Sequence, residues 1–173
     1  MKSGPSIAVS AIISGTVASL VSSAALAGLA KAEGKRAVQP LNATSHWLHG
    51  EQAGQTRQAD IAHTAIGYAT HHGASIFWAC LFELMRARRI QPSAADVVKD
   101  AMIVAAIAAA VDYGVMPKRV TPGWEEVLST TSMVGGFLAM ATGLTLGGLL
   151  TPDPDPAPRA WRARSTLRLA ARR

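Results

Sequence analysis

Three long stretches of this chain contain no Asp, Glu, Lys or Arg, and they limit what it can fold into. They cover residues 3–30, 61–82 and 127–151. A helix of about 20 apolar residues is long enough to cross the hydrocarbon core of a bilayer. Each of the three stretches is long enough to do so, and each therefore predicts a transmembrane helix.

A fourth segment, residues 97–115, is shorter and carries charges near its ends, but its centre consists almost wholly of Ala, Ile and Val. We therefore expect an all-α protein, an integral membrane bundle of four transmembrane helices with a basic cytoplasmic tail. The expected transmembrane domain is residues 1–151, with spans at about 6–30, 61–84, 95–115 and 125–150 and an external loop at 31–60. Residues 152–173 form a Pro/Asp spacer and an Arg-rich tail.

Composition leaves little room for a soluble domain. The chain has 173 residues, of which 49% are hydrophobic, and four spans of 20 to 25 residues use about 90 of them. The single cysteine, Cys80, permits no intramolecular disulfide. The net charge of +6 comes from basic residues beside apolar spans, a pattern that indicates membrane orientation before nucleic-acid binding.

The first span has a competing interpretation as a signal peptide. Lys2, the apolar run and the small residues at 25–27 resemble a secretory signal with an A-x-A cleavage site, so residues 1–27 would be removed. The uncharged run is, however, longer than an ordinary signal core, and only one lysine precedes it. A retained helix is the preferred interpretation, and its many serines fit a helix packed against others and bonded back to its own backbone.

Orientation follows from the distribution of Lys and Arg between the two sides. With four spans, one side carries Lys2, Arg86, Arg88, Arg89, Lys99, Arg159, Arg162, Arg164, Arg168, Arg172 and Arg173. The other side carries Lys31, Lys35, Arg36, Arg57, Lys118 and Arg119. The excess of basic residues marks the cytoplasmic side, so both termini are expected in the cytoplasm.

Helix-start patterns support the span boundaries. Ser93 and Asp96 form a capping-box pattern that predicts the start of the third span. Thr121 and Pro122 predict the start of the fourth helix, as N-cap and first helical residue. Alternating prolines at residues 152–156 end that helix.

Small residues recur every four positions along the fourth span. They are Gly135, Ala139, Gly143 and Gly147. Such a spacing places a groove of small side chains on one helix face, where another helix can approach closely. Homodimerisation through this face is one interpretation, and packing against the first or second span of the same chain is the favoured one.

All five histidines lie in the first external segment and the second span, at His46, His49, His63, His71 and His72. On a helix, Asp60, His63, Gly67, His71, Trp78 and Phe82 share one stripe. His71 lies near mid-membrane and is expected to face the bundle, because ionisable groups at that depth rarely face lipid. His72 needs a separate partner.

The third span places Asp112 near the depth of His63, so the two side chains could pair. His46, His49, Asp60, His63 and Asp112 would then supply imidazole and carboxylate ligands suited to zinc or another divalent metal. A proton relay is a second hypothesis. The preferred interpretation is interhelical hydrogen bonding, with no metal or cofactor, because the H-x-x-H and D-x-x-H patterns are short and frequent.

Other residues indicate structural roles. Trp47 and Trp124 are expected at the outer interface as aromatic anchors, and Arg86 or Arg88 is expected to neutralise Glu83 at the inner boundary. No nucleophile with an adjacent base, phosphate-binding loop or cysteine cluster is visible in the sequence, so an enzyme is not expected. The tail is expected to rest on anionic lipid rather than to bind nucleic acid.

Four segments resemble uncharacterised small multi-pass inner-membrane proteins of proteobacteria. They are PLNATSHW at 40–47, HHGASIFW at 71–78, VDY at 111–113 and PKRVTPG at 117–123. The resemblance covers about residues 40–125. It implies a bacterial inner-membrane setting and no particular activity or site residue.

Two functions follow as hypotheses. The first is a non-enzymatic structural or accessory membrane component, with the bilayer and a possible homo-oligomer or membrane-protein partner. The alternative is a small oligomeric transporter or channel for protons or a divalent metal that uses His63, His71 and Asp112. A water-lined cavity at His71 would favour transport, and a dry, hydrogen-bonded His71 would favour the structural role.

Overall fold

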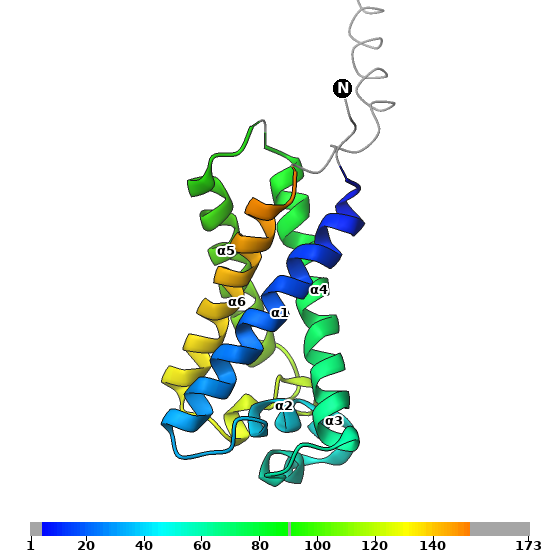
Figure 1. Cartoon of the computed structure of the whole chain (residues 1–173), viewed down its shortest axis with the longest axis vertical. Helices are drawn as coiled ribbons and strands as arrows, with labels where there is room; N and C mark the ends of the chain where they lie inside the picture. Colours follow the sequence, from blue (N-terminus) through cyan, green and yellow to red (C-terminus); the bar gives the residue numbers. More distant parts are fainter. Residues whose placement is uncertain (1–4, 90, 153–173) are drawn as a thin grey trace, which may run out of the picture.

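The computed structural model describes residues 5–89 and 91–152 of the chain. It is all-α: 79% of it is helical, and the described residues contain no strand, which confirms the predicted fold class at this level. Four long helices run side by side along the molecule (Figure 1). These are α1 (Ile7–Ala32), α4 (Ile66–Ala87), α5 (Ala94–Gly114) and α6 (Thr130–Leu150). The predicted Arg-rich tail falls outside the described residues.

Two of the four long helices, α1 and α6, are both long and apolar enough to cross a membrane. Helices α4 and α5 have the length but carry more polar residues. All four run between the same two ends of the molecule (Figure 1). The start of α1 and the end of α4 lie at one end, and the short helices α2 and α3 lie at the other.

Helix α1 is the central element of the bundle. It crosses α4 and α6 diagonally (Figure 1) and contacts them more extensively than any other two described elements contact each other. Its buried face is built from small residues, chiefly serine, alanine and glycine. Small side chains allow helix backbones to approach closely, and the resulting dispersion contacts are what hold helices together where no water is displaced.

The small-residue face of α6 packs against α1 within the chain. A Cβ atom added at Gly147 would lie 2.5 Å from Ser14 Cα, and one added at Gly143 would meet the backbone of Ala18. Gly135 lies beside the Leu29 side chain of α1 with slightly more room. Ala139 is half-buried. The groove predicted from the sequence is therefore filled by α1.

Two serine hydroxyls of α1 donate to carbonyls of their own helix, the kind of bond that the sequence predicts. Ser14 Oγ donates to the Ser10 carbonyl at 2.8 Å, and Ser22 Oγ donates to the Ala18 carbonyl at 2.7 Å. Each of these two hydroxyls thus donates its only hydrogen within its own helix. Its lone pairs stay available to a donor from another helix.

The predicted capping box of the third long helix is confirmed. The Ser93 side chain accepts from the Asp96 backbone amide, and the Asp96 carboxylate accepts from the Ser93 amide. At the same end, Arg89 binds Asp96 at 3.0 Å and the buried Asp100 at 2.5 Å. Nearby, Arg86 binds Glu83 at 2.7 Å with both side chains buried, which confirms the predicted neutralisation of Glu83.

The predicted start of the fourth helix is wrong. Helix α6 begins after Ser129, whose side chain accepts from the Ser132 amide. Thr121 does not cap a helix, since its hydroxyl binds the Glu125 carboxylate at 2.5 Å. Gly123 then adopts a left-handed conformation with φ of 77°, which ends any helical path there and leaves only a short 3-10 turn at Trp124–Glu126.

The predicted external loop at 31–60 is a folded segment rather than an open loop. It contains α2 (Gln39–Thr44), α3 (His46–His49) and a 3-10 helix at Glu51–Gln55. Asn42 holds it together: its side-chain amide donates to the carbonyls of Thr56 and Gln58, and its side-chain oxygen accepts from Thr64 Oγ1. The segment therefore closes one end of the bundle (Figure 1).

Glu33 joins the end of α1 to the start of α6. Its carboxylate accepts from the Ser129 backbone amide at 3.1 Å and from the hydroxyls of Ser129 and Ser132, both at 2.5 Å. The hydrogen bonds from the Ser129 and Ser132 hydroxyls are the main reason that the pKa of Glu33 lies below its ordinary value of 4.5. The contact stabilises the folded state only while the carboxylate is charged.

We predict that Gly143→Leu destabilises the bundle, because the added side chain would meet the Ala18 backbone. Overpacking of this kind costs about 1 to 3 kcal/mol. The measurement is the unfolding free energy in detergent. Gly73→Leu is the matched control, since nothing lies within 4 Å of a Cβ atom added at Gly73, and an equal loss in both variants would contradict the prediction.

We predict that Glu33→Gln flattens the acid end of the stability profile. A carboxylate with a lowered folded pKa stabilises the protein above its unfolded pKa, and that contribution disappears as pH falls through the folded value. The melting temperature of the wild type is expected to fall between about pH 6 and about pH 3 more steeply than that of the variant. Glu126→Gln, at an exposed position, is the control and should leave the wild-type slope unchanged.

Candidate functional site

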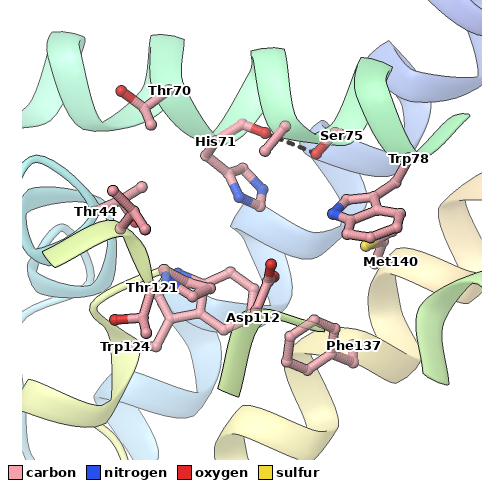
Figure 2. Close-up of a pocket in the computed structure, with 13 residues that line it drawn as sticks. Thr44, Thr70, His71, Ser75, Trp78, Asp112, Thr121, Trp124, Phe137 and Met140 are labelled. Carbon is pink, nitrogen blue, oxygen red and sulfur yellow. Dashed lines mark hydrogen bonds between the residues drawn. The ribbon is translucent and has the colours of Figure 1, made fainter. Parts of the chain in front are cut away.

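A cavity of about 90 Å³ lies between α4, α5 and α6 and is lined on one side by the segment that precedes α6. Figure 2 shows the side chains that surround it. Its described lining is Thr44 from α2; Thr70, His71, Ala74, Ser75 and Trp78 from α4; Asp112 from α5; Val120, Thr121, Pro122 and Trp124 from the connection; and Phe137 and Met140 from α6. One imidazole, one carboxylate and three large aromatic side chains therefore meet in one place.

Helical spacing explains the contribution of α4. His71, Ser75 and Trp78 are separated by four and three residues, so they lie along one face. That face is turned inward, and His71 and Ser75 are buried. The predicted inward orientation of His71 is therefore confirmed.

His71 is hydrogen-bonded to the central helix. Its Nε2 lies 2.9 Å from Ser22 Oγ, and the Ser22 hydroxyl already donates to the Ala18 carbonyl. The hydrogen-bond network therefore assigns the proton of a neutral ring to Nε2, which donates to Ser22. Nδ1 is then an acceptor, and the ring centroid lies 5.8 Å from that of Trp124.

Asp112 brings a carboxylate to the cavity. Figure 2 shows it pointing from α5 towards His71 and the Trp78 indole. The side chain is half-buried, and among the described residues no hydrogen bond or ion pair satisfies it. Glu125 acts on it as a second negative charge. No Lys or Arg belongs to the described lining.

Asp112 and His63 do not form the pair that the sequence suggested. His63 Nδ1 instead lies 3.0 Å from Asp60, the N-cap residue of a π-helical turn (Ile61–Ala65) that leads into α4. The His63 backbone amide also donates to Asp60 at 2.6 Å, and this bond, as the main cause, holds the pKa of Asp60 below its ordinary value of 3.8. His63 therefore binds the capping carboxylate of Asp60, three residues away, and does not pair with Asp112 of α5.

The other histidines have separate partners. His49 Nε2 donates to the Ala62 carbonyl at 2.9 Å, and its ring lies 4.7 Å from that of His63. His46 is buried, with its ring nitrogens 3.0 Å from the Ala43 carbonyl and 2.9 Å from the Lys118 carbonyl. His72 Nδ1 lies 2.9 Å from Ser19 Oγ. Within residues 5–89 and 91–152, no three His, Cys, Asp or Glu side chains converge in a way that could hold a metal ion.

Trp124 is the cavity residue that the sequence misplaced. We expected it at the outer interface, but only 3% of it is exposed. Its ring centroid lies 5.3 Å from that of Phe137. The Pro122–Gly123 turn, which directs the chain back under the bundle, is the one signal from which this burial could have been foreseen.

Comparison with known proteins adds no relative: no family model matches the chain, and no curated protein or solved structure matches it significantly. The resemblance to proteobacterial inner-membrane proteins therefore stays a prediction.

We predict that Ser22→Ala destabilises the protein by about 0.6 to 2 kcal/mol, the range for interhelical hydrogen bonds in bilayers. The substitution removes the acceptor of His71 Nε2. Ser23→Ala is the matched control, because Ser23 Oγ is buried and has no hydrogen-bond partner in the described part of the chain. Unfolding in detergent measures both, and equal stability of the two variants would argue against the assigned bond.

Proposed function

We propose that this chain is a polytopic membrane protein with four transmembrane helices that acts as a non-enzymatic structural or accessory component of a bacterial inner membrane. The observation that carries the proposal is the distribution of large apolar side chains over the outer surface. Every long helix exposes at least two of them, while most of the buried polar side chains of these helices lie inside, beside large apolar residues such as Phe82 and Leu144. The exposed set includes Ile12 and Leu20 of α1, Phe77 and Leu84 of α4, Ile103 and Ile107 of α5, and Leu138 and Leu146 of α6.

This distribution supports spans for α4 and α5 despite their lower average hydropathy. Four of their polar residues face the inside: His71, Glu83, Arg86 and Asp100 are all buried. Averaging hydropathy along a helix mixes the lipid face with the inner face, while only the lipid face meets hydrocarbon. The buried charges are also near opposite charges, as a bilayer requires.

The proposed orientation places both termini in the cytoplasm, from the excess of Lys and Arg on that side. The tail at 152–173 would then lie against anionic lipid. Helix α1 is proposed to be retained rather than cleaved, because the faces of α4 and α6 that it covers contain His71 and Gly143. A homo-oligomer would use the outer faces of the bundle, since the α6 groove is occupied by α1.

A non-catalytic role is supported by how the hydroxyl groups of the cavity are used. Ser75, the serine of its described lining, donates to the His71 backbone carbonyl at 2.8 Å rather than to an imidazole. A serine nucleophile needs a base that accepts its proton. The arrangement therefore favours helix packing over acyl transfer.

Transport of protons or a divalent metal is the second candidate, and the cavity is the observation that favours it. It joins two of the residues named for such a path, His71 and Asp112. His63 belongs instead to the capping turn with Asp60. A flux through this protein would therefore depend on His71 and Asp112 rather than on His63.

The topology predicts the behaviour of a reporter that is active only in the cytoplasm. It is expected to be active when fused after Arg173 or inserted at Gln91, and inactive when inserted at Gly34, which lies in an exposed turn after α1. Gly34 is chosen over Gly54 as the insertion site between α1 and α4, because Gly54 packs closely against the Val127 side chain. Activity at all three positions, with equal expression, would contradict the four-span arrangement.

A further inference from the structure

The cavity beside His71 offers several hydrogen-bond acceptors, and the indole N–H groups of Trp78 and Trp124 are donors in its described lining. Three hydroxyl groups that line it each donate their hydrogen to a backbone carbonyl: Thr44 to Pro40, Thr70 to Ile66 and Ser75 to His71. Their remaining capacity is to accept. His71 Nδ1 adds a further acceptor, because Nε2 holds the proton that binds Ser22. A ligand that uses these acceptors must bring donors.

The charge at the cavity is negative, which favours a cationic ligand. Asp112 points into it (Figure 2), and Glu125 adds a second carboxylate nearby. No Lys or Arg is among the described residues that line it. The Asp112 carboxylate is half-buried, and a cation bound beside it would offset the cost of its partial removal from water.

The walls of the cavity favour an organic cation over a metal ion. Trp78, Trp124 and Phe137 supply aromatic surface, and Met140 supplies a thioether. Aromatic faces attract ammonium groups, whereas hard metal ions require several oxygen ligands. Among the described residues that line the cavity, only His71 and Asp112 have a His, Cys, Asp or Glu side chain that could bind a metal ion.

The size of the cavity limits the ligand. Its volume is about 90 Å³, which is less than the roughly 150 Å³ of an apolar cavity that holds benzene. A group of about four non-hydrogen atoms is compatible with that space. We infer that this cavity is a binding site for a small protonated alkylamine, with its N–H groups on Asp112 and His71 and its alkyl part against Trp78, Trp124 and Phe137. This site goes beyond the proposed structural role and does not depend on it.

Propylammonium is the test ligand, and 1-propanol is its neutral isostere. The full-length protein in detergent is titrated with each at constant ionic strength near neutral pH, and binding is followed by saturation-transfer NMR of the ligand methyl protons. Ligands of this size bind at about millimolar dissociation constants. We expect saturable binding of propylammonium and at least about tenfold weaker binding of 1-propanol, since the latter lacks the charge-assisted hydrogen bonds.

Two pairs of variants locate the binding. Asp112→Asn keeps the shape and removes the charge, and it should weaken propylammonium binding about tenfold or more. Asp60→Asn is its control, because asparagine caps a helix as well as aspartate does. Trp78→Leu should weaken binding about threefold or more, while Phe77→Leu, at a neighbouring residue that is 65% exposed, should not.

Three results would overturn the inference. They are the absence of saturable binding to folded wild-type protein, equal binding of propylammonium and 1-propanol, and binding that survives both Asp112→Asn and Trp78→Leu. Circular dichroism and gel filtration confirm that each variant is folded, and the two cavity variants test the site separately. The assay uses detergent-solubilised protein, so a failed topology experiment would leave its outcome unaffected, and the two proposals can fail independently.

Discussion

The close contact of α1 with both α4 and α6 is the interaction on which the rest of this structure depends. In a bilayer the hydrophobic effect does not drive one helix against another, so association relies on dispersion contacts and hydrogen bonds between closely spaced backbones. Gly15 of α1 allows the Ile76 backbone to approach, and Gly147 of α6 allows Ser14 to approach. Ser19 and Ser22 of α1 then reach the rings of His72 and His71. Helix α1 therefore sets both the packing and the position of the imidazoles.

The sequence predicted features that depend on neighbouring residues. Runs without charge located three of the four long helices, and the Ser93–Asp96 pattern located the start of α5 because a capping box is made by residues three positions apart. The serines of α1 bond back over one turn for the same local reason. The inward face of His71 followed from helical periodicity and the cost of exposing an imidazole to lipid.

Features that depend on how separate segments meet were not predictable in this way. The pairing of His63 with Asp112 was inferred from depth alone, but a capping contact three residues away competes for the same imidazole. Trp124 lies beneath the bundle because Gly123 turns the chain left-handed. The folded segment at 31–60 depends on Asn42 joining three carbonyl or hydroxyl groups that the sequence places up to 22 residues away. These arrangements require the tertiary structure.

The hydrogen bonds of Ser14 and Ser22 within α1 also bear on the insertion of this helix during synthesis. Helix α1 precedes its partners α4 and α6 in the chain, so they follow it only after more of the chain has been synthesised. An isolated helix in hydrocarbon must keep its polar groups bonded. Because Ser14 and Ser22 donate to carbonyls of their own helix, α1 placed alone in a bilayer would not expose those hydroxyl hydrogens to lipid. The same hydroxyl oxygens are then ready to accept a bond when the later helices arrive.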